Sequence, residues 1–313
     1  MAIARNIHSD RGLTGRMFLT GLLLVVLYGV FGAVLFHFLH SFVAMFVIIG
    51  ALLFCQYWFS DKIALWGMHG RIVSAEEAPE LHGAVDRLCA LADMPKPRVA
   101  IADTDIPNAF ATGRSPKAAV VCATTGLMRR LEEPEIEAVL AHEISHVAHR
   151  DVAIMTIASS LGVIAGLTTR VMLYAGLFGG GRGGNTNSAG QMAAMEGIIM
   201  LVSIAVYAVS FLLTRALSRY RELAADRSGA ILIGRPSLLA SALVKITGEM
   251  GRIPTKDLRS AEPFNAFFFT PAIAQKPGRQ QGMSIGTLFS THPTLERRLA
   301  QLAQLEAELN QPR

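Results

Sequence analysis

Two histidines four residues apart, with a glutamate directly after the first, are the side chains of this chain best suited to chemistry. They occur in the stretch 141–146, which reads Ala-His-Glu-Ile-Ser-His. On a helix this spacing puts His142 and His146 one turn apart on one face, where two imidazoles can bind one metal ion. Glu143 lies beside them and can act as a general base toward a water molecule without being a ligand. The motif predicts a hydrolytic zinc site, for which a third protein ligand is needed.

The best candidate for this third ligand is Glu222, in the stretch 221–226, which reads Arg-Glu-Leu-Ala-Ala-Asp. Asp226 follows one helical turn later, where it can accept a hydrogen bond from the non-ligating nitrogen of a ligand histidine. The alternative is a solvated helix face on which both acids pair with Arg221 or Arg227.

Helix lengths favour Glu222 as the ligand. His142 lies about ten residues, or ~15 Å, before the start of an apolar run, and Glu222 lies about eight residues, or ~12 Å, after the end of another. Two antiparallel helices would therefore hold His142, His146 and Glu222 at similar heights above the same membrane face.

An acyl-transfer site also needs a group that stabilises the negative charge on the carbonyl oxygen. His292, in the stretch Ser-Thr-His-Pro at 290–293, is the first candidate, with Arg297 second and Tyr220 third. A lone histidine is more often an ordinary surface residue, and the spacing alone does not favour a catalytic role of His292 over that alternative.

A small sheet is expected upstream of the motif. Residues 78–92 have helical periodicity, and 98–101 and 118–122 are short β-like runs. The stretch 108–113, Asn-Ala-Phe-Ala-Thr-Gly, lies between these runs. A sheet edge here could align an extended peptide by strand addition, which makes Asn108, Ala109 and Phe110 candidate substrate-binding residues.

The composition indicates a membrane protein. The chain has 51% hydrophobic and only 17% charged residues, whereas soluble domains carry about 25% charged residues. Its net charge is +5, but Lys and Arg form no dense patch with interleaved aromatics, so lipid headgroups are a better partner than nucleic acid. About four transmembrane helices are predicted, at the apolar runs 17–36, 41–59, 152–178 and 192–213. The first run is too long for a signal peptide and has no cleavage site after it.

The placement of Lys and Arg predicts the orientation. The N-terminus and the segments after the second and fourth runs are basic, and the two opposite turns are not. Both termini and both soluble segments are therefore expected in the cytosol.

This pattern divides the chain into alternating membrane and cytosolic parts. The expected parts are a transmembrane hairpin at 1–62, a cytosolic half with the sheet and motif helix at 63–151, a second hairpin at 152–216 and a second cytosolic half at 217–313. The motif helix is expected from about Pro134 through residue 151, a flexible segment at 179–191, a long loop at 251–290, and an amphipathic helix at 294–309.

These motifs, in this order, resemble the HtpX membrane zinc metalloproteases, which are relatives of the CAAX prenyl endopeptidases. The resemblance spans most of the chain. Besides the stretches 108–113, 141–146 and 221–226, it includes Asn-Ala-Phe-Phe-Phe at 265–269 and Phe-Ser-Thr-His-Pro at 289–293.

The resemblance implies a mainly α integral membrane protein with a cytosolic α+β, zincin-like protease domain that carries a small sheet. It implies that His142, His146 and Glu222 bind Zn²⁺, that Glu143 is catalytic and that Asp226 orients a ligand. It further implies cleavage of misfolded or damaged membrane proteins in the stress response and quality control of the bacterial inner membrane. Arg150 and the glycine-rich segment at 179–190 depart from the family pattern.

Two other functions fit parts of the sequence. An intramembrane metalloprotease of the site-2 type also uses H-E-x-x-H, but it would place the motif in an apolar helix and add an aspartate from an L-D-G sequence, which is absent. A membrane transporter or scaffold with an incidental metal site would use Arg170 and Glu196 and would not need Glu143.

Overall fold

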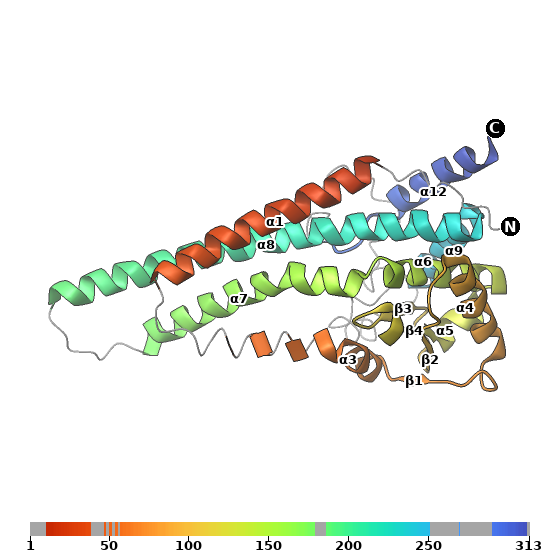
Figure 1. Cartoon of the computed structure of the whole chain (residues 1–313), viewed down its shortest axis with the longest axis horizontal. Helices are drawn as coiled ribbons and strands as arrows, with labels where there is room; N and C mark the ends of the chain where they lie inside the picture. The colour runs from red at the N-terminus through yellow and green to blue at the C-terminus, as the bar shows by residue number, and fades with distance from the viewer. Residues whose placement is uncertain are drawn as a thin grey trace.

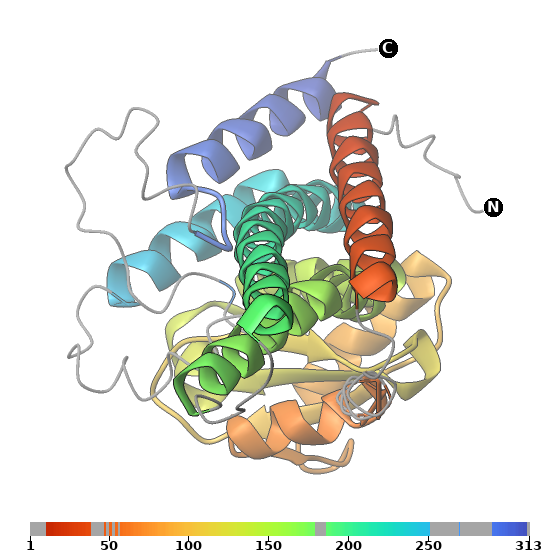
Figure 2. The same ribbon diagram turned by 90° about the vertical axis from the view of Figure 1, so that its left-hand side faces the viewer.

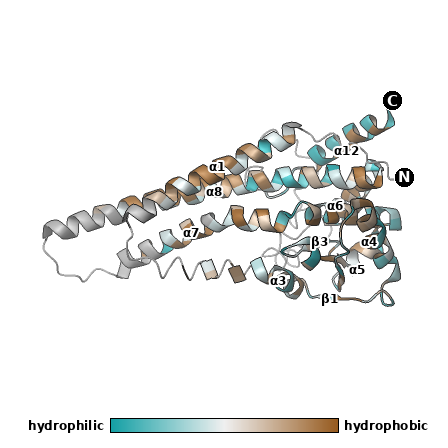
Figure 3. Ribbon diagram, viewed as in Figure 1, coloured by the Kyte–Doolittle hydropathy of each residue, from teal (hydrophilic) through white to brown (hydrophobic). Residues whose placement is uncertain are grey.

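Three long helices extend from a globular part that contains the sheet (Figure 1). The computed structural model describes residues 11–38, 47, 50–51, 54–55, 57–178, 186–250, 269 and 290–311. The long helices are α1 (Arg11–Phe38), α7 (Asp151–Phe178) and α8 (Thr186–Ile233). Each contains a segment long and apolar enough to cross a membrane, and Figure 3 shows hydrophobic residues along all three. They correspond to the first, third and fourth predicted crossings; the predicted run at 41–59 and the predicted segment at 251–290 fall largely outside the described residues.

Small residues let α7 and α8 approach each other closely. A Cβ atom added to Gly162 would lie 3.5 Å from Ser210, and one added to Gly166 would lie 3.3 Å from the ring of Tyr207. Helices in lipid associate mainly through such close packing, because burial of apolar surface gives no advantage there. α1 packs mainly on α8, so α8 is the central helix of this part.

α8 is longer than the sequence predicted. It runs without a break for 48 residues, from within the segment expected to be flexible to well beyond residue 213. Helix propagation adds one hydrogen bond for each residue fixed, which favours continuing an established helix in both directions. One rigid element thus joins the apolar segment to Glu222 and Asp226.

The sheet has four strands in the order β1-β2-β4-β3. They are β1 (Gly70–Ile72), β2 (Arg98–Ala102), β3 (Ala109–Thr112) and β4 (Val120–Thr124). β2 and β4 are parallel, whereas β1 and β3 form antiparallel edges. The strand β3 covers most of the 108–113 stretch, which sequence periodicity did not mark as a strand.

Helices pack on the sheet and on one another in the globular part (Figure 2). They are α3 (Ser60–Gly67), α4 (Pro79–Ala92), α5 (Thr125–Arg130), α6 (Glu133–Ala148), α9 (Pro236–Met250) and α12 (Leu295–Asn310). The predicted helices at 78–92 and 294–309 are confirmed, and the Thr294 side chain caps the latter. The main core joins the sheet to α4, α6, α9 and α12.

The motif helix ends earlier than predicted. α6 stops at Ala148, and α7 begins at Asp151. Between them Arg150 adopts a left-handed backbone conformation, with φ of 55°. A run of helical residues cannot pass through this conformation, so the chain bends between the motif and the apolar segment.

Candidate active site and metal centre

The motif helix is fixed at its start and along one side. Glu132 and Glu135 form a reciprocal capping box at its N-terminus, and Pro134 occupies the first turn. The buried Glu135 carboxylate also accepts hydrogen bonds from Ser241 and Lys245 of α9. These contacts hold α6 against α9 while its last two turns carry the motif.

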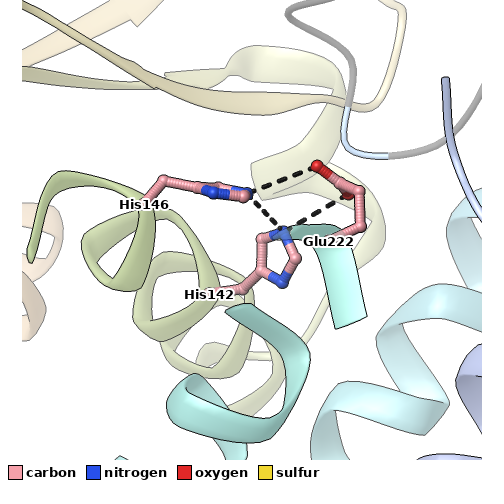
Figure 4. Close-up of side chains that lie close together, drawn as sticks. All are labelled: His142, His146 and Glu222. Atoms are coloured by element: carbon pink, nitrogen blue, oxygen red, sulfur yellow. Dashed lines mark hydrogen bonds and ion pairs between the residues drawn. The ribbon is translucent and has the colours of Figure 1, made fainter. Parts of the chain in front are cut away.

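The structure brings His142, His146 and Glu222 together (Figure 4). The Nε2 atoms of the two histidines are 3.1 Å apart. Oε2 of Glu222 lies 3.7 Å from His142 Nε2, and Oε1 lies 3.4 Å from His146 Nε2. The predicted convergence of α6 and α8 is therefore present in the structure.

These separations suit a metal ion. A tetrahedral ion with bonds of ~2.0–2.1 Å holds its ligand atoms ~3.3–3.4 Å apart, and the three observed distances lie on both sides of that value. Three protein ligands leave the fourth tetrahedral position to water or substrate, as at catalytic zinc sites.

The other ring nitrogen of each histidine faces a carboxylate. Asp226 Oδ1 lies 2.9 Å from His142 Nδ1, and Asp151 Oδ2 lies 2.5 Å from His146 Nδ1. A proton on each Nδ1 leaves the Nε2 lone pairs pointing at one another and at Glu222. Three hydrogen-bond acceptors facing one point need a cation between them, which is the strongest reason that these residues fit a metal.

The sequence between residues 75 and 306 matches the family described as Peptidase family M48. The match covers about three quarters of the chain and includes every residue of the cluster. The chain belongs to peptidase family M48. It is therefore a metallopeptidase, and this excludes the site-2-type and transporter alternatives.

Curated relatives agree along almost the whole length. Protease HtpX homolog 1 of Streptomyces coelicolor is 59% identical over 304 residues, which are 97% of this chain and 96% of that protein. Protease HtpX homolog of Moorella thermoacetica is 53% identical over 310 residues, 99% of each chain. The chain is thus an HtpX-type membrane metalloprotease of the M48 family.

The fold is shared with a more distant solved structure. The crystal structure of Ste24p from S. mikatae aligns with a TM-score of 0.56 at 17% sequence identity, covering 92% of this chain and 67% of that one. At this identity the likeness concerns the fold alone.

Burial and charge set the protonation of the M48 motif. Burial raises the pKa of Glu143 to about 8, against a smaller opposite effect of His146. Burial alone would lower the pKa of His146, but Asp151 and Glu222 outweigh it and raise that pKa to about 10. In the absence of a metal, a proton on His146 thus supplies the positive charge that the cluster needs.

Glu143 faces the edge of the sheet. Its Oε2 accepts a hydrogen bond from the main-chain N–H of Ala111, at 2.9 Å. In an antiparallel strand, successive residues direct their main-chain groups to opposite sides. Because Asn108 O accepts from Thr124 N of β4, Ala109 and Ala111 direct theirs to the open edge. The general-base candidate therefore lies against the strand that a substrate would extend.

The structure buries all three predicted substrate-binding residues. Ala109 directs its main-chain groups away from β4, but its exposed fraction is 0%. The side chains of Asn108 and Phe110 are buried, with exposed fractions of 0% and 2%. Asn108 Oδ1 accepts a hydrogen bond from Phe269 N at 2.8 Å, and the Phe269 ring lies edge-on to His142. Asn108 thus holds Phe269 over the cluster.

The three candidates for charge stabilisation also differ. His292 is buried, and its Nδ1 lies 3.2 Å from Glu222 Oε2. Its Nε2 has no hydrogen-bond partner within the described part of the chain. Arg297 is exposed and Tyr220 is half-buried. Only His292 is placed in the cluster.

Sequence reasoning missed three residues that hold the cluster. Asp151 binds His146 and also Arg221, whose Nη2 lies 2.5 Å from the same carboxylate oxygen. Arg298 is 2% exposed and binds both oxygens of Asp226, at 2.7 and 2.6 Å. The sequence instead suggested its neighbour Arg297, as the second candidate for charge stabilisation. The periodicity of the C-terminal helix does carry a signal, because Arg298 lies on the same face as Leu295, Leu302 and Leu305.

Proposed function

We propose that the chain is a zinc-dependent, membrane-anchored endopeptidase that cleaves misfolded or damaged membrane proteins at the cytosolic face of the bacterial inner membrane. The observation that carries the proposal is the convergence of His142, His146 and Glu222, whose ligand atoms all lie within 4.8 Å of one another. Two imidazoles and one carboxylate form the ligand set of well-known hydrolytic zinc sites.

In this proposal His142, His146 and Glu222 hold the zinc ion. Zinc, when bound, supplies Lewis acidity toward water and toward the scissile carbonyl. Asp226 and Asp151 fix the ring orientation and tautomer of His142 and His146, and Arg298 and Arg221 keep the two aspartates charged.

Glu143 is the general base. It takes a proton from the attacking water as the carbon–oxygen bond forms, and delivers a proton to the leaving nitrogen as the carbon–nitrogen bond breaks. Its buried carboxylate, with a raised pKa, suits a group that both accepts and releases a proton near neutral pH.

His292 stabilises the negative charge that develops on the carbonyl oxygen. Its buried Nε2 without a partner can donate to that oxygen, while Nδ1 contacts Glu222. His292→Gln should lower kcat by ~100-fold or more with KM little changed and zinc content retained. Loss of zinc in this variant would instead assign His292 to holding Glu222.

The substrate backbone adds to the open edge of β3. Ala109 is fully buried and the Ala111 N–H donates to Glu143, so an extended peptide pairs at the half-buried end of the strand, from Ala111 onward, where its scissile bond lies beside Glu143. Peptide or protein substrates follow from the metallopeptidase family; extended, unfolded segments of membrane proteins suit strand addition and a site that adjoins the apolar helices.

The location follows from charge placement. Basic residues flank the segments that carry the site, which favours a cytosolic orientation for both termini and both soluble parts. The division into two hairpins (1–62 and 152–216) and two cytosolic halves (63–151 and 217–313) belongs to the same proposal. α7 and α8 support it, since each joins an apolar segment directly to a part of the site.

A casein cleavage assay in detergent tests this function. The purified wild type should cleave casein, and both a zinc chelator and Glu143→Gln should abolish cleavage. Glu143→Gln should keep its zinc, measured by elemental analysis, because Glu143 is not a ligand. Cleavage that survives in this variant would overturn the proposed mechanism.

A further inference from the structure

A small cleft lies beside the metal-ligand cluster, between the end of β3 and the bend that joins α6 to α7. Its enclosed part has room for about one water molecule, and the space of about 240 Å³ between its residues includes the open solvent at its mouth. One wall contains Thr112 and Ser115, and the other contains His146, Arg150 and Asp151. The same cleft therefore touches a metal-ligand residue and the strand along which a substrate would pair.

This position puts the cleft beside the path of a peptide that extends β3. Ala111, which also lines it, directs its main-chain N–H to Glu143 at the open edge. Alternate side chains of a peptide that extends β3 point to the same face, so a side chain near the scissile bond can reach the mouth of the cleft.

The cleft contains a polar group without a partner. Thr112 is 1% exposed, and its Oγ1 makes no hydrogen bond within the described residues. Buried polar side chains are nearly always paired, so an unpaired hydroxyl in a cleft wall marks a place for a polar ligand atom. The Ser115 side chain adds a second hydroxyl to the same wall.

The charge in the cleft is positive. The Asp151 carboxylate is already neutralised by Arg221 and His146. The C-terminus of α6 and the N-terminus of α7 meet here, and their dipoles oppose each other. Arg150 is exposed and forms no ion pair with any described residue. Its guanidinium is therefore the uncompensated charge.

The backbone of Arg150 supports a functional role. Its φ of 55° lies in the left-handed region, which is unfavourable for a residue with a Cβ atom. Such strained conformations cluster at binding and catalytic sites. Elsewhere in a chain, an unstrained conformation or a glycine at the position is the usual outcome. A glycine would fit this bend without strain, but it would carry no charge.

We propose that this cleft is a specificity pocket that binds an acidic side chain of the substrate, Glu or Asp, close to the scissile bond, and that Arg150 selects its charge. Thr112 and Ser115 supply hydroxyls to the same carboxylate. The inference rests on the proposed endopeptidase function and adds a substrate preference to it.

A lipid phosphate is the competing anion, because α7 enters its apolar segment directly after Arg150. The cleft favours the peptide: its walls include the edge strand and His146, and both belong to the catalytic site.

Matched peptides test the proposal. Quenched fluorescent peptides that differ only by Glu, Gln or Lys at one position, scanned across the residues around the cleavage point, are compared in neutral detergent micelles. At one position the wild type should cleave the Glu peptide with a kcat/KM roughly tenfold above that of the Gln peptide, with Lys lowest. Arg150→Glu should reverse the order of Glu and Lys. The ratio within one variant does not depend on the amount of active enzyme.

Two further variants serve as controls. Arg150→Gly relieves the backbone strain and should fold even where Arg150→Glu does not; its Glu:Gln ratio should fall to about one. Arg71→Glu changes an exposed arginine of β1, at the opposite edge of the sheet, and should keep the wild-type ratio.

Three outcomes overturn the proposal. The first is that the wild type cleaves the Glu and Gln peptides equally well. The second is that the Arg150 variants keep the wild-type Glu:Gln ratio of kcat/KM. The third is that Arg150 is required only for activation by added anionic lipid. Failure of the endopeptidase function looks different: no peptide is cleaved, or Glu143→Gln cleaves as well as the wild type.

Discussion

Gly229 of α8 packs directly against the main chain of His142 in α6. A Cβ atom at residue 229 would lie 2.7 Å from His142 N and 2.9 Å from His142 Cα. Gly229 follows Glu222 by seven residues, two helical turns, so both lie on one face of α8. The missing side chain lets α8 approach α6 closely enough for Glu222 to reach the two histidines.

Gly229→Ala should therefore separate the two helices and weaken the metal site. Overpacking of this kind costs ~1–3 kcal/mol, and a shift of the Glu222 carboxylate should lower both zinc content and peptidase activity by roughly tenfold or more. Elemental analysis and casein cleavage measure the two effects. Gly197→Ala, on the same helix with no atom within 4 Å of the added Cβ, is the matched control. Equal zinc content in both variants would show that the close approach is not required.

Asp151→Asn should weaken metal binding. The amide cannot accept the His146 Nδ1 proton as a carboxylate does, and it loses the ion pair with Arg221. Loss of such a partner typically costs 10–100-fold in metal affinity. Titration with a competing chelator, followed by residual activity, measures the shift. The exposed Asp105 offers a control as Asp105→Asn, and the same midpoint in both variants would argue against the role of Asp151.

Arg298→Met should destabilise the protein strongly. It leaves the fully buried Asp226 carboxylate without its counter-charge and removes the donor to Phe269 O. Breaking a buried ion pair from one side costs ~3–5 kcal/mol. Thermal unfolding in detergent should show a clearly lower midpoint. Arg297→Met changes the adjacent, exposed arginine and should shift stability by less than ~0.5 kcal/mol. Similar midpoints for the two variants would contradict the importance of the buried pair.

Metal binding should release a proton and strengthen as the pH rises. In the metal-free protein the pKa of His146 is raised to about 10, so its imidazole is protonated at neutral pH and must lose that proton to become a ligand. Between pH 6 and 8 the apparent zinc affinity should rise about tenfold per pH unit for this one proton. Calorimetry in buffers of different ionisation enthalpy counts the protons. His149→Gln, at the exposed end of α6, should keep the same slope, and a pH-independent affinity would refute the assignment.

The sequence alone determined the elements that carry the site. The spacing of His142 and His146, the position of Glu222 and the apolar runs are local patterns, and helix geometry converts such patterns into faces and heights. Helix α12 and the strands β2 and β4 were also predictable, because α12 has apolar residues at helical spacing and the two buried strands are short continuous apolar runs.

The tertiary structure alone decided which distant side chains support that site. Asp151 reads in the sequence as an ordinary polar residue; only the bend at Arg150 turns it toward His146 and Arg221. Arg297 and Arg298 are equal candidates by type, and only the docking of α12 buries one of them against Asp226. β3 is recognisable by its pairing with β4 rather than by periodicity. Contacts between residues 70 or more positions apart depend on how whole elements pack, and no local pattern encodes that packing.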